Sequence, residues 1–362
     1  MGFDVFCYFL AILVGASYVL QVLFVSCSAG GAVVEFRAQW RQAALALRSL
    51  AWEVSTQKTY ASYKKSYLDF CKLARYKPVP VSVDMVCEYI AFLSDRLSYA
   101  SILKYIGIIR VMQLEMGLPD PKVHESYEVK LMLMAVKKLL GTTVKRRLPI
   151  GPELLAVMHS RLCHQSTNDT VFWAVCLVGF FGLLRASNLV APPGDQFDVS
   201  KHLSRASFRD YGSYMVVTLL WAKNNQVGRM VQIPLPRLVG SVLCPVQAVR
   251  QAFQLTGEAN LFGPAFMRRQ ADSKLTPVRY SWFSKKLLDL VEACGLDRSL
   301  YGTHRLRRGG ASWALKCGFS SEVIRILGDW HSDAYQNYLE VPLEDKLLHM
   351  QLFAKSVSQV HV

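Results

Sequence analysis

Residues 301–338 hold the densest set of side chains suited to chemistry in this sequence. His304 lies three positions before Arg307, so one helical turn can aim both side chains at the same point. The downstream half adds an indole, an imidazole and two phenols: Trp330, His331, Tyr335 and Tyr338. Cationic donors that converge with a phenol suit the attack of a tyrosine oxygen on a phosphodiester, because they stabilise the charge that builds in the transition state. The structural alternative is a basic surface helix followed by core aromatics.

Other elements must position these side chains. The glycine pair Gly309 and Gly310 predicts a close approach of the backbone to a ligand or a second helix. The apolar run 171–184 is too short to span a bilayer comfortably and predicts a buried core helix that ends at Arg185. An arginine on the rim of a core loses little entropy when it binds a phosphate. The alternative is an arginine that only extends to solvent from the helix end.

A predicted hairpin supplies a further candidate. Residues 214–220 and 230–235 are rich in β-forming side chains and flank a polar loop, which places Lys223 at the mouth of a hairpin. A lysine on such a tip can protonate a leaving oxygen, whereas most hairpin lysines are only solvated.

Composition limits the classes of protein that fit. A chain of 362 residues with 52% hydrophobic and 19% charged residues is an ordered globular protein, long enough for two domains. The net charge of +15 favours a polyanionic partner, with nucleic acid first and an acidic membrane surface second. The nine cysteines are scattered singly without a CxxC pair, which indicates reduced thiols in an intracellular compartment and argues against a disulfide framework or a zinc site.

The first 40 residues differ from the rest of the chain in composition, because most of them are apolar. Residues 5–27 are almost wholly apolar and about as long as a membrane span, but no basic leader precedes them. If they inserted, Arg37 and Arg41 would place the body of the protein on the cytoplasmic side. They are either a membrane anchor or a non-native extension such as a mistaken first exon. The second interpretation is preferred, because an anchor fits poorly with an enzyme acting on nucleic acid.

Residues 41–145 predict a helical domain. Ser55 can cap a first helix with Tyr60, Tyr63, Tyr67 and Phe70 as its apolar stripe, and Ser82 can cap a second. Two more helices are expected at 99–116 and 127–140. Residues 41–150 carry 18 Lys and Arg against 9 Asp and Glu, so this domain could clamp a duplex through its phosphates. The alternative is an ordinary bundle with a solvated basic face.

The basic, proline-ended segment 141–149 predicts a linker. The expected organisation is therefore an apolar segment 1–40, a helical domain 41–145 and a second domain 146–362. Within the second domain, further helices are expected after Cys244 and over 276–294.

The ordered motifs resemble the tyrosine recombinase, or phage-integrase-like, family. They are Arg185 in GLLRASNL, Lys223 in a hairpin, His304 and Arg307 in THRLRRGGAS, Trp330 in GDWHSDAY, and Tyr338. Their wording is most similar to the eukaryotic transposon-borne branch, meaning Crypton elements and retrotransposons that carry such a recombinase. The resemblance covers about residues 50–345.

The resemblance implies a mainly α fold with a small β-sheet or hairpin. A helical core-binding (SAM-like) domain and a mixed α/β catalytic domain would close around double-stranded DNA, and family members work as tetramers. It also implies a nuclear location in a eukaryote, or a cytoplasmic one otherwise. The implied activity is DNA breakage and rejoining through a 3′-phosphotyrosine, without metal or cofactor. The alternative is a catalytically silent DNA-binding protein derived from such an enzyme.

The resemblance also implies roles for individual residues. Arg185 and Arg307 would hold the scissile phosphate, His304 would assist proton transfer and Trp330 would donate through its indole N–H. Lys223 would protonate the departing 5′ oxygen, and Tyr338 would be the nucleophile.

Some positions depart from the family pattern or leave a choice open. Asn188 replaces the usual acid, and Arg305 adds a charge inside the His-x-x-Arg motif. His331 is the alternative to Trp330, and Tyr335 is the alternative nucleophile.

Overall fold

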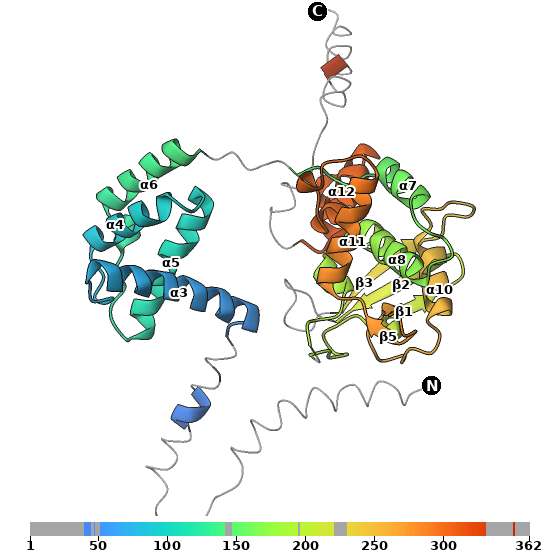
Figure 1. Cartoon of the computed structure of the whole chain (residues 1–362), viewed down its shortest axis with the longest axis horizontal. Helices are drawn as coiled ribbons and strands as arrows, with labels where there is room; N and C mark the ends of the chain where they lie inside the picture. The colour runs from blue at the N-terminus through green and yellow to red at the C-terminus, as the bar shows by residue number, and fades with distance from the viewer. Residues whose placement is uncertain are drawn as a thin grey trace, which may run out of the picture. The chain divides into compact units, whose positions relative to one another are not determined.

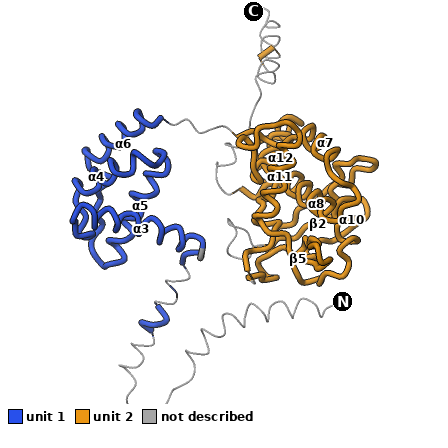
Figure 2. Tube along the Cα trace, in the orientation of Figure 1, with its two compact units in different colours: residues 1–144 blue, residues 145–362 orange. Residues whose placement is uncertain are grey.

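The computed structural model describes residues 40–44, 47, 51–141, 147–194, 196–220, 230–330 and 350–351 (Figure 1). The chain divides into two compact units, residues 1–144 and 145–362 (Figure 2). Helices dominate both units and the strands form small antiparallel sheets, which confirms the predicted fold class. The apolar segment 5–27 lies outside the described residues. Among the residues that are described, no helix is both long and apolar enough to cross a bilayer.

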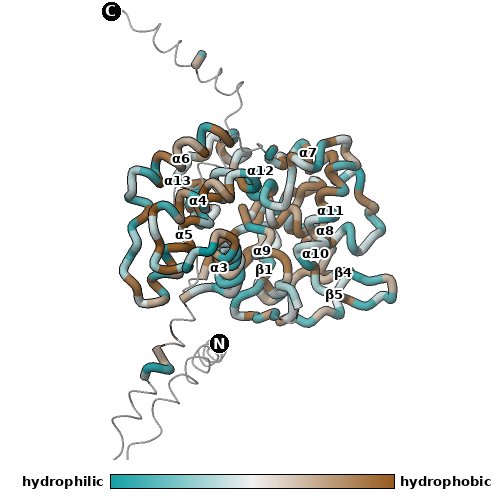
Figure 3. Tube along the Cα trace, turned by 60° about the vertical axis from the view of Figure 1, so that its left-hand side comes forward, coloured by the Kyte–Doolittle hydropathy of each residue, from teal (hydrophilic) through white to brown (hydrophobic). Residues whose placement is uncertain are grey.

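The first unit consists of helices packed around one core. Their bounds are α3 (Val54–Ala74), α4 (Val83–Ser94), α5 (Tyr99–Glu115), the short 3-10 helix η1 (Val123–Glu125) and α6 (Tyr127–Leu140). The predicted aromatic stripe of α3 is confirmed, since Tyr67 and Phe70 are buried and Tyr60 and Tyr63 pack against the same core. Figure 3 shows much of α5 in brown, the hydrophobic end of its scale. Each helix is thus held by its apolar face.

The two predicted serine caps of this unit have different outcomes. Ser82 caps α4 as expected, because its hydroxyl accepts a hydrogen bond from the backbone N–H of Met85 at 3.3 Å. The expectation for Ser55 is wrong. Helix α3 already begins at Val54 with Glu53 as its N-cap, so the backbone of Ser55 lies inside the first turn and its carbonyl accepts from Thr59 Oγ1 at 2.9 Å.

The second unit combines helices with short strands. Its helices are α7 (Pro152–Ser160), α8 (Thr167–Phe181), α9 (Ala186–Leu189), α10 (Pro245–Leu255), α11 (Tyr280–Ala293), α12 (His304–Lys316) and α13 (Ser321–Leu327), with 3-10 turns η2 (Arg205–Ser207) and η3 (Arg298–Leu300). Its strands are β1 (Phe208–Asp210), β2 (Tyr214–Leu219), β3 (Val231–Pro236), β4 (Met267–Arg269) and β5 (Leu275–Pro277). Helix α8 is the centre of the core, with residues 171–180 all buried.

The predicted hairpin is confirmed as the antiparallel pair β2–β3. Val217 lies opposite Ile233 and Met215 opposite Leu235, and all four side chains are buried on the core face. Strand β1 extends this sheet in the order β1-β2-β3, which was not predicted. Lys223 belongs to residues 221–229, which lie outside the described part of the chain.

Two element ends differ from the prediction. Helix α8 ends at Phe181 because Gly182 caps it and Leu183 takes a positive φ of 48°, so Arg185 lies beyond a turn and becomes the N-cap of α9. Helix α11 begins at Tyr280 because residues 275–277 pair with β4 as a second small sheet. The hydrophilic turn of that hairpin is teal in Figure 3. Both differences come from pairing and turn geometry that the helical period of the sequence does not reveal.

Candidate active site

Helix α12 carries two of the predicted residues on one turn. His304 is its first residue and Arg307 lies a turn later, as the spacing predicts. Arg307 is only 2% exposed. Its Nη2 donates to the backbone carbonyl of Gly328 at 2.8 Å, and its guanidinium carbon lies 4.0 Å from the centroid of the Trp330 ring. A carbonyl and an aromatic face therefore fix the orientation of this cation.

Residues of the turn after α13 contact Arg307 on two sides. Trp330 is 5% exposed and packs with Leu183, Ala311 and Ile324 in a small satellite core. A Cβ placed on Gly328 would lie 1.7 Å from the Trp330 ring, so only glycine lets the ring cover this point. Sequence reasoning missed Gly328. The sequence shows only a glycine two positions before a tryptophan. That this glycine must lack a side chain becomes evident only in the folded turn, where the Trp330 ring lies against it.

The glycine pair brings α12 against the rest of the second unit. A Cβ on Gly309 would lie 1.8 Å from the carbonyl oxygen of Ile150, and one on Gly310 would lie 2.2 Å from that of Phe180. The predicted close approach is therefore an approach to other backbone segments. Because Phe180 is in the last turn of α8, this contact fixes the helix that bears His304 and Arg307 relative to the turn that leads to Arg185.

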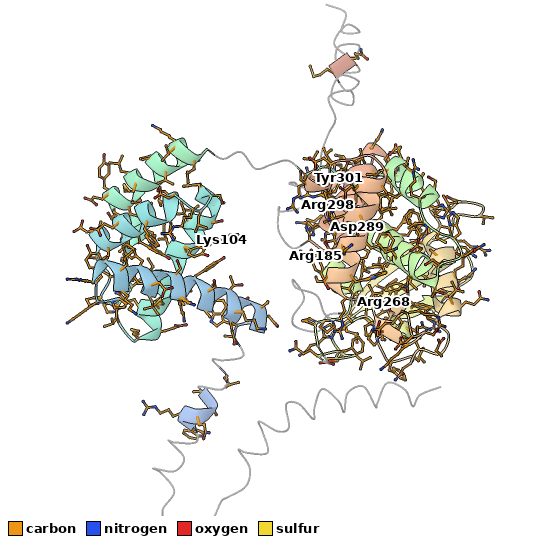
Figure 4. All side chains as sticks on the ribbon, viewed as in Figure 1. Lys104, Arg185, Arg268, Asp289, Arg298 and Tyr301 are labelled. Carbon is orange, nitrogen blue, oxygen red and sulfur yellow. The ribbon has the colours of Figure 1, made fainter. Side chains whose placement is uncertain are left out.

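Positive charges gather around His304. The pKa of His304 is lowered to about 4, mainly by burial and then by the charges of Arg307, Arg185 and Arg305, in that order. His304 is therefore neutral at pH 7 and close to all three guanidinium groups. Arg185 is half-buried and forms no ion pair within the described residues. Figure 4 shows Arg185 on the same flank of the second unit as Tyr301, which precedes α12.

The structure thus brings together Arg185, His304, Arg307 and Trp330. The other predicted site residues lie outside the described part of the chain: Lys223, His331, Tyr335 and Tyr338. Two guanidinium groups beside a neutral imidazole can bind a tetrahedral oxyanion and exchange a proton with it. Within the described ranges no group of three or more His, Cys, Asp or Glu side chains is arranged to hold a metal ion.

The chain is similar to known proteins in sequence and in fold. No family model matches the sequence. The chain is 23% identical over 266 residues to an integrase/recombinase XerD homolog of Selenomonas ruminantium, and the match covers 72% of this chain and 73% of that protein.

Solved structures are similar over most of the chain. XerH site-specific recombinase bound to a palindromic difH substrate has a TM-score of 0.56 at 12% identity, covering 94% of this chain and 89% of that one. The Tn1549 transposon integrase in complex with transposon right-end DNA has a TM-score of 0.52 at 13% identity, covering 84% and 95%. A lambda integrase dimer bound to a COC′ core site has a TM-score of 0.51 at 12% identity, covering 81% and 91%.

The chain has the tyrosine recombinase fold. The similarity to the XerD homolog agrees with the resemblance that the motifs suggested, and the solved recombinase and integrase structures share the fold. In this tyrosine recombinase fold, α12 packs against α8, and the turn after α8 leads to Arg185, so that Arg185, His304 and Arg307 lie in one corner of the second unit.

Proposed function

We propose that the chain is a site-specific DNA recombinase or integrase that breaks and rejoins DNA through a 3′-phosphotyrosine intermediate. The observation that carries this proposal is the convergence of Arg185 and Arg307 on a neutral His304 in a chain with this fold. The structural neighbours are recombinases and integrases in complex with DNA, which supports double-stranded DNA as the partner. The excess of basic residues over 41–150 supports a core-binding role for that domain.

The proposed reaction follows from the charges. Arg185 and Arg307 bind the non-bridging oxygens of the scissile phosphate and offset the charge that builds in the transition state. The Tyr338 oxygen attacks phosphorus as the phenol loses its proton, and we infer that neutral His304 assists that transfer. The bond to the 5′ oxygen breaks, and Lys223 protonates the departing oxygen. The new phosphotyrosyl bond replaces the broken phosphodiester, so rejoining is the same reaction in reverse.

Trp330 acts in this proposal through Arg307. Its ring face lies against the guanidinium, which restricts the orientation of the cation before a phosphate arrives. Donation from its indole N–H to the phosphate stays a prediction, with His331 as the alternative donor.

Several finer points complete the proposal. We infer from the motif wording a mobile-element origin in the Crypton or tyrosine-recombinase retrotransposon branch, a nuclear location in a eukaryotic host and assembly as a tetramer on DNA. Residues 5–27 are inferred to be an extension with no part in recombination. If instead the protein is extracted from native cells only with detergent, that segment is a membrane anchor.

The experiment is a covalent trap in which the DNA target is selected from random sequences. The purified protein is incubated with a library of nicked duplexes of randomised core sequence, and DNA that remains attached after denaturation is sequenced. The wild-type protein and Tyr335→Phe should both capture DNA, whereas Tyr338→Phe should capture none. An adduct that persists in Tyr338→Phe contradicts the assigned nucleophile. Salt-dependent binding with no adduct would instead establish a silent DNA-binding protein.

A further inference from the structure

A second group of arginines lies beside the proposed phosphate site. Arg305 and Arg308 occupy the same face of α12, one turn apart. Their Nη1 atoms each donate to the backbone carbonyl of Arg147 at 3.4 Å. The side chain of Arg147 folds over Gly302, since a Cβ on that glycine would lie 3.3 Å from Arg147 Nη1. The side chains of these three arginines therefore lie near the N-terminal end of α12.

Backbone pairing holds these arginines in place. The N–H of Leu148 donates to the carbonyl of Leu300 at 2.7 Å, and the N–H of Ile150 donates to that of Arg305 at 3.1 Å. The segment that starts with Arg147 is thus fixed along the first turn of α12. Arg147 itself is exposed and forms no ion pair within the described residues. The three positive charges at this end of α12 together attract an anion such as a phosphate.

The position of this group relates it to the catalytic corner. Successive residues of an α-helix point about 100° apart, so Arg305 and Arg308 occupy the face next to that of His304 and Arg307. The charge of Arg305 reaches His304 and helps to lower its pKa. One DNA strand presents a phosphate about every 3.4 Å along the duplex axis, so adjacent faces of one helix end can contact neighbouring phosphates.

We propose that Arg147, Arg305 and Arg308 form a second anion site, the flanking-phosphate site, which binds a DNA backbone phosphate next to the one held by Arg185 and Arg307. The inference rests on the function proposed above and extends it to a second contact. The flanking-phosphate site holds the strand in register with the catalytic residues and takes no part in the chemistry. Arginine suits this task because its planar fork can bind two phosphate oxygens together.

The first test measures how salt affects binding to a short mixed-sequence duplex, followed by fluorescence anisotropy over a series of sodium chloride concentrations. Non-specific binding is electrostatic, so the target sequence is not needed. Arg147→Gln keeps the backbone carbonyl that Arg305 and Arg308 contact, and the double variant Arg305→Gln/Arg308→Gln removes the other two charges. The slope of log K against log salt is negative. Its magnitude should be smaller in the Arg147 variant and in the double variant, each by up to about 0.9, which is the value for one phosphate contact.

Matched variants separate charge from folding. Arg161→Gln, on an exposed arginine that caps α7, should leave the slope unchanged. Arg305→Lys/Arg308→Lys keeps both charges and should restore the wild-type slope even if it changes the thermal unfolding midpoint. The inference is overturned if both glutamine variants keep the wild-type slope while Arg185→Gln lowers it, and the proposed function then stands. If the wild-type protein shows no salt-dependent duplex binding, the inference and the proposed function fail together.

A second test locates the phosphate. On the nicked duplex recovered by the covalent trap, a neutral methylphosphonate replaces one backbone phosphate at a time. At the phosphate adjoining the scissile one, the replacement should weaken binding by the wild-type protein but not by Arg305→Gln/Arg308→Gln. Equal weakening of both proteins at every position overturns the assignment.

Discussion

Two buried arginines of the second unit, Arg205 and Arg307, have similar surroundings at first sight. Arg205 is 8% exposed, lies 4.8 Å from the centroid of the Phe253 ring and donates through Nη1 to the Phe253 carbonyl at 3.4 Å. Arg307 is 2% exposed, stacks on Trp330 and donates to the Gly328 carbonyl. Each therefore combines burial, an aromatic face and a backbone acceptor.

Their charged neighbours differ. Arg205 also donates to the hydroxyl of Thr256 and lies near Glu258, an acid that partly offsets the fall in the pKa of Arg205 caused by burial. Arg307 lies beside His304, whose pKa the charges of Arg185 and Arg305 also lower. Several cations gathered around one perturbed histidine are typical of a functional site. The presence of other cations nearby is thus what marks Arg307 as a functional residue.

The largest effect should come from replacing Arg307. Arg307→Met removes a donor aimed at the developing charge, so adduct formation on the nicked duplex should fall by about 10²–10³-fold or more. Arg205→Met should leave adduct formation unchanged per folded molecule. The yield of denaturation-resistant protein–DNA complex over time measures both. Equal losses in the two variants would contradict the distinction between them.

Replacing Gly328 should have the next largest effect. Gly328→Ala drives a Cβ into the Trp330 ring and should displace Arg307, so the adduct rate should fall roughly tenfold to a hundredfold, in line with the cost of misplaced catalytic groups. Gly318→Ala is the control for a glycine, because a Cβ there meets no atom within 4 Å. It should leave the adduct rate per folded molecule unchanged, although its φ of 85° will cost stability. A normal rate for Gly328→Ala would show that Trp330 does not position Arg307.

For stability, the order of the two arginines should be the opposite of that for adduct formation. Arg205→Met loses hydrogen bonds to Thr256 and Phe253 and should lower the free energy of unfolding by about 1–2 kcal/mol. Arg307→Met should cost less, because methionine keeps the packing against the Trp330 ring that covers Arg307. Urea denaturation of the two variants measures the difference. A larger loss of stability for Arg307→Met would indicate that Arg307 is mainly a structural residue.

The pH dependence should be the smallest effect and concerns His304. Its pKa in the folded protein is about 4, below the ordinary value of 6.5, so the unfolded chain binds a proton more readily. The contribution of His304 to the free energy of unfolding should therefore be complete above pH 6.5 and decrease as the pH falls toward 4. Urea denaturation from pH 7 to pH 4 should show a shallower decline for His304→Gln than for the wild-type protein. Identical declines would mean that His304 titrates normally.

Local patterns predicted much of the fold. The N-cap Ser82, the strand pair β2–β3 and the one-turn spacing of His304 and Arg307 depend on residues that are close in sequence, and all three are present. The end of α8 depends on the positive φ of Leu183, and β5 depends on pairing with β4. Neither feature can be predicted from the spacing of apolar residues along the sequence.

The candidate site shows the same division. The types and order of Arg185, His304, Arg307 and Trp330 are visible in the sequence, and the structure brings these four together. The contribution of Gly328 is not visible there, because it depends on a turn that returns the chain to α12. Likewise, the meeting of Arg147 with Arg305 and Arg308 joins residues more than 150 positions apart.

The central claim is that cations on α12 and at the start of α9 present one phosphate to a tyrosine. Peptide mapping of the trapped complex tests this most directly: the adduct is trimmed with nuclease and protease, and mass spectrometry locates the nucleotide. A nucleotide on the peptide that contains Tyr338, lost in Arg185→Gln and in Arg307→Met, is the predicted result. A nucleotide on another residue, or an adduct that forms equally well without either arginine, would contradict the account.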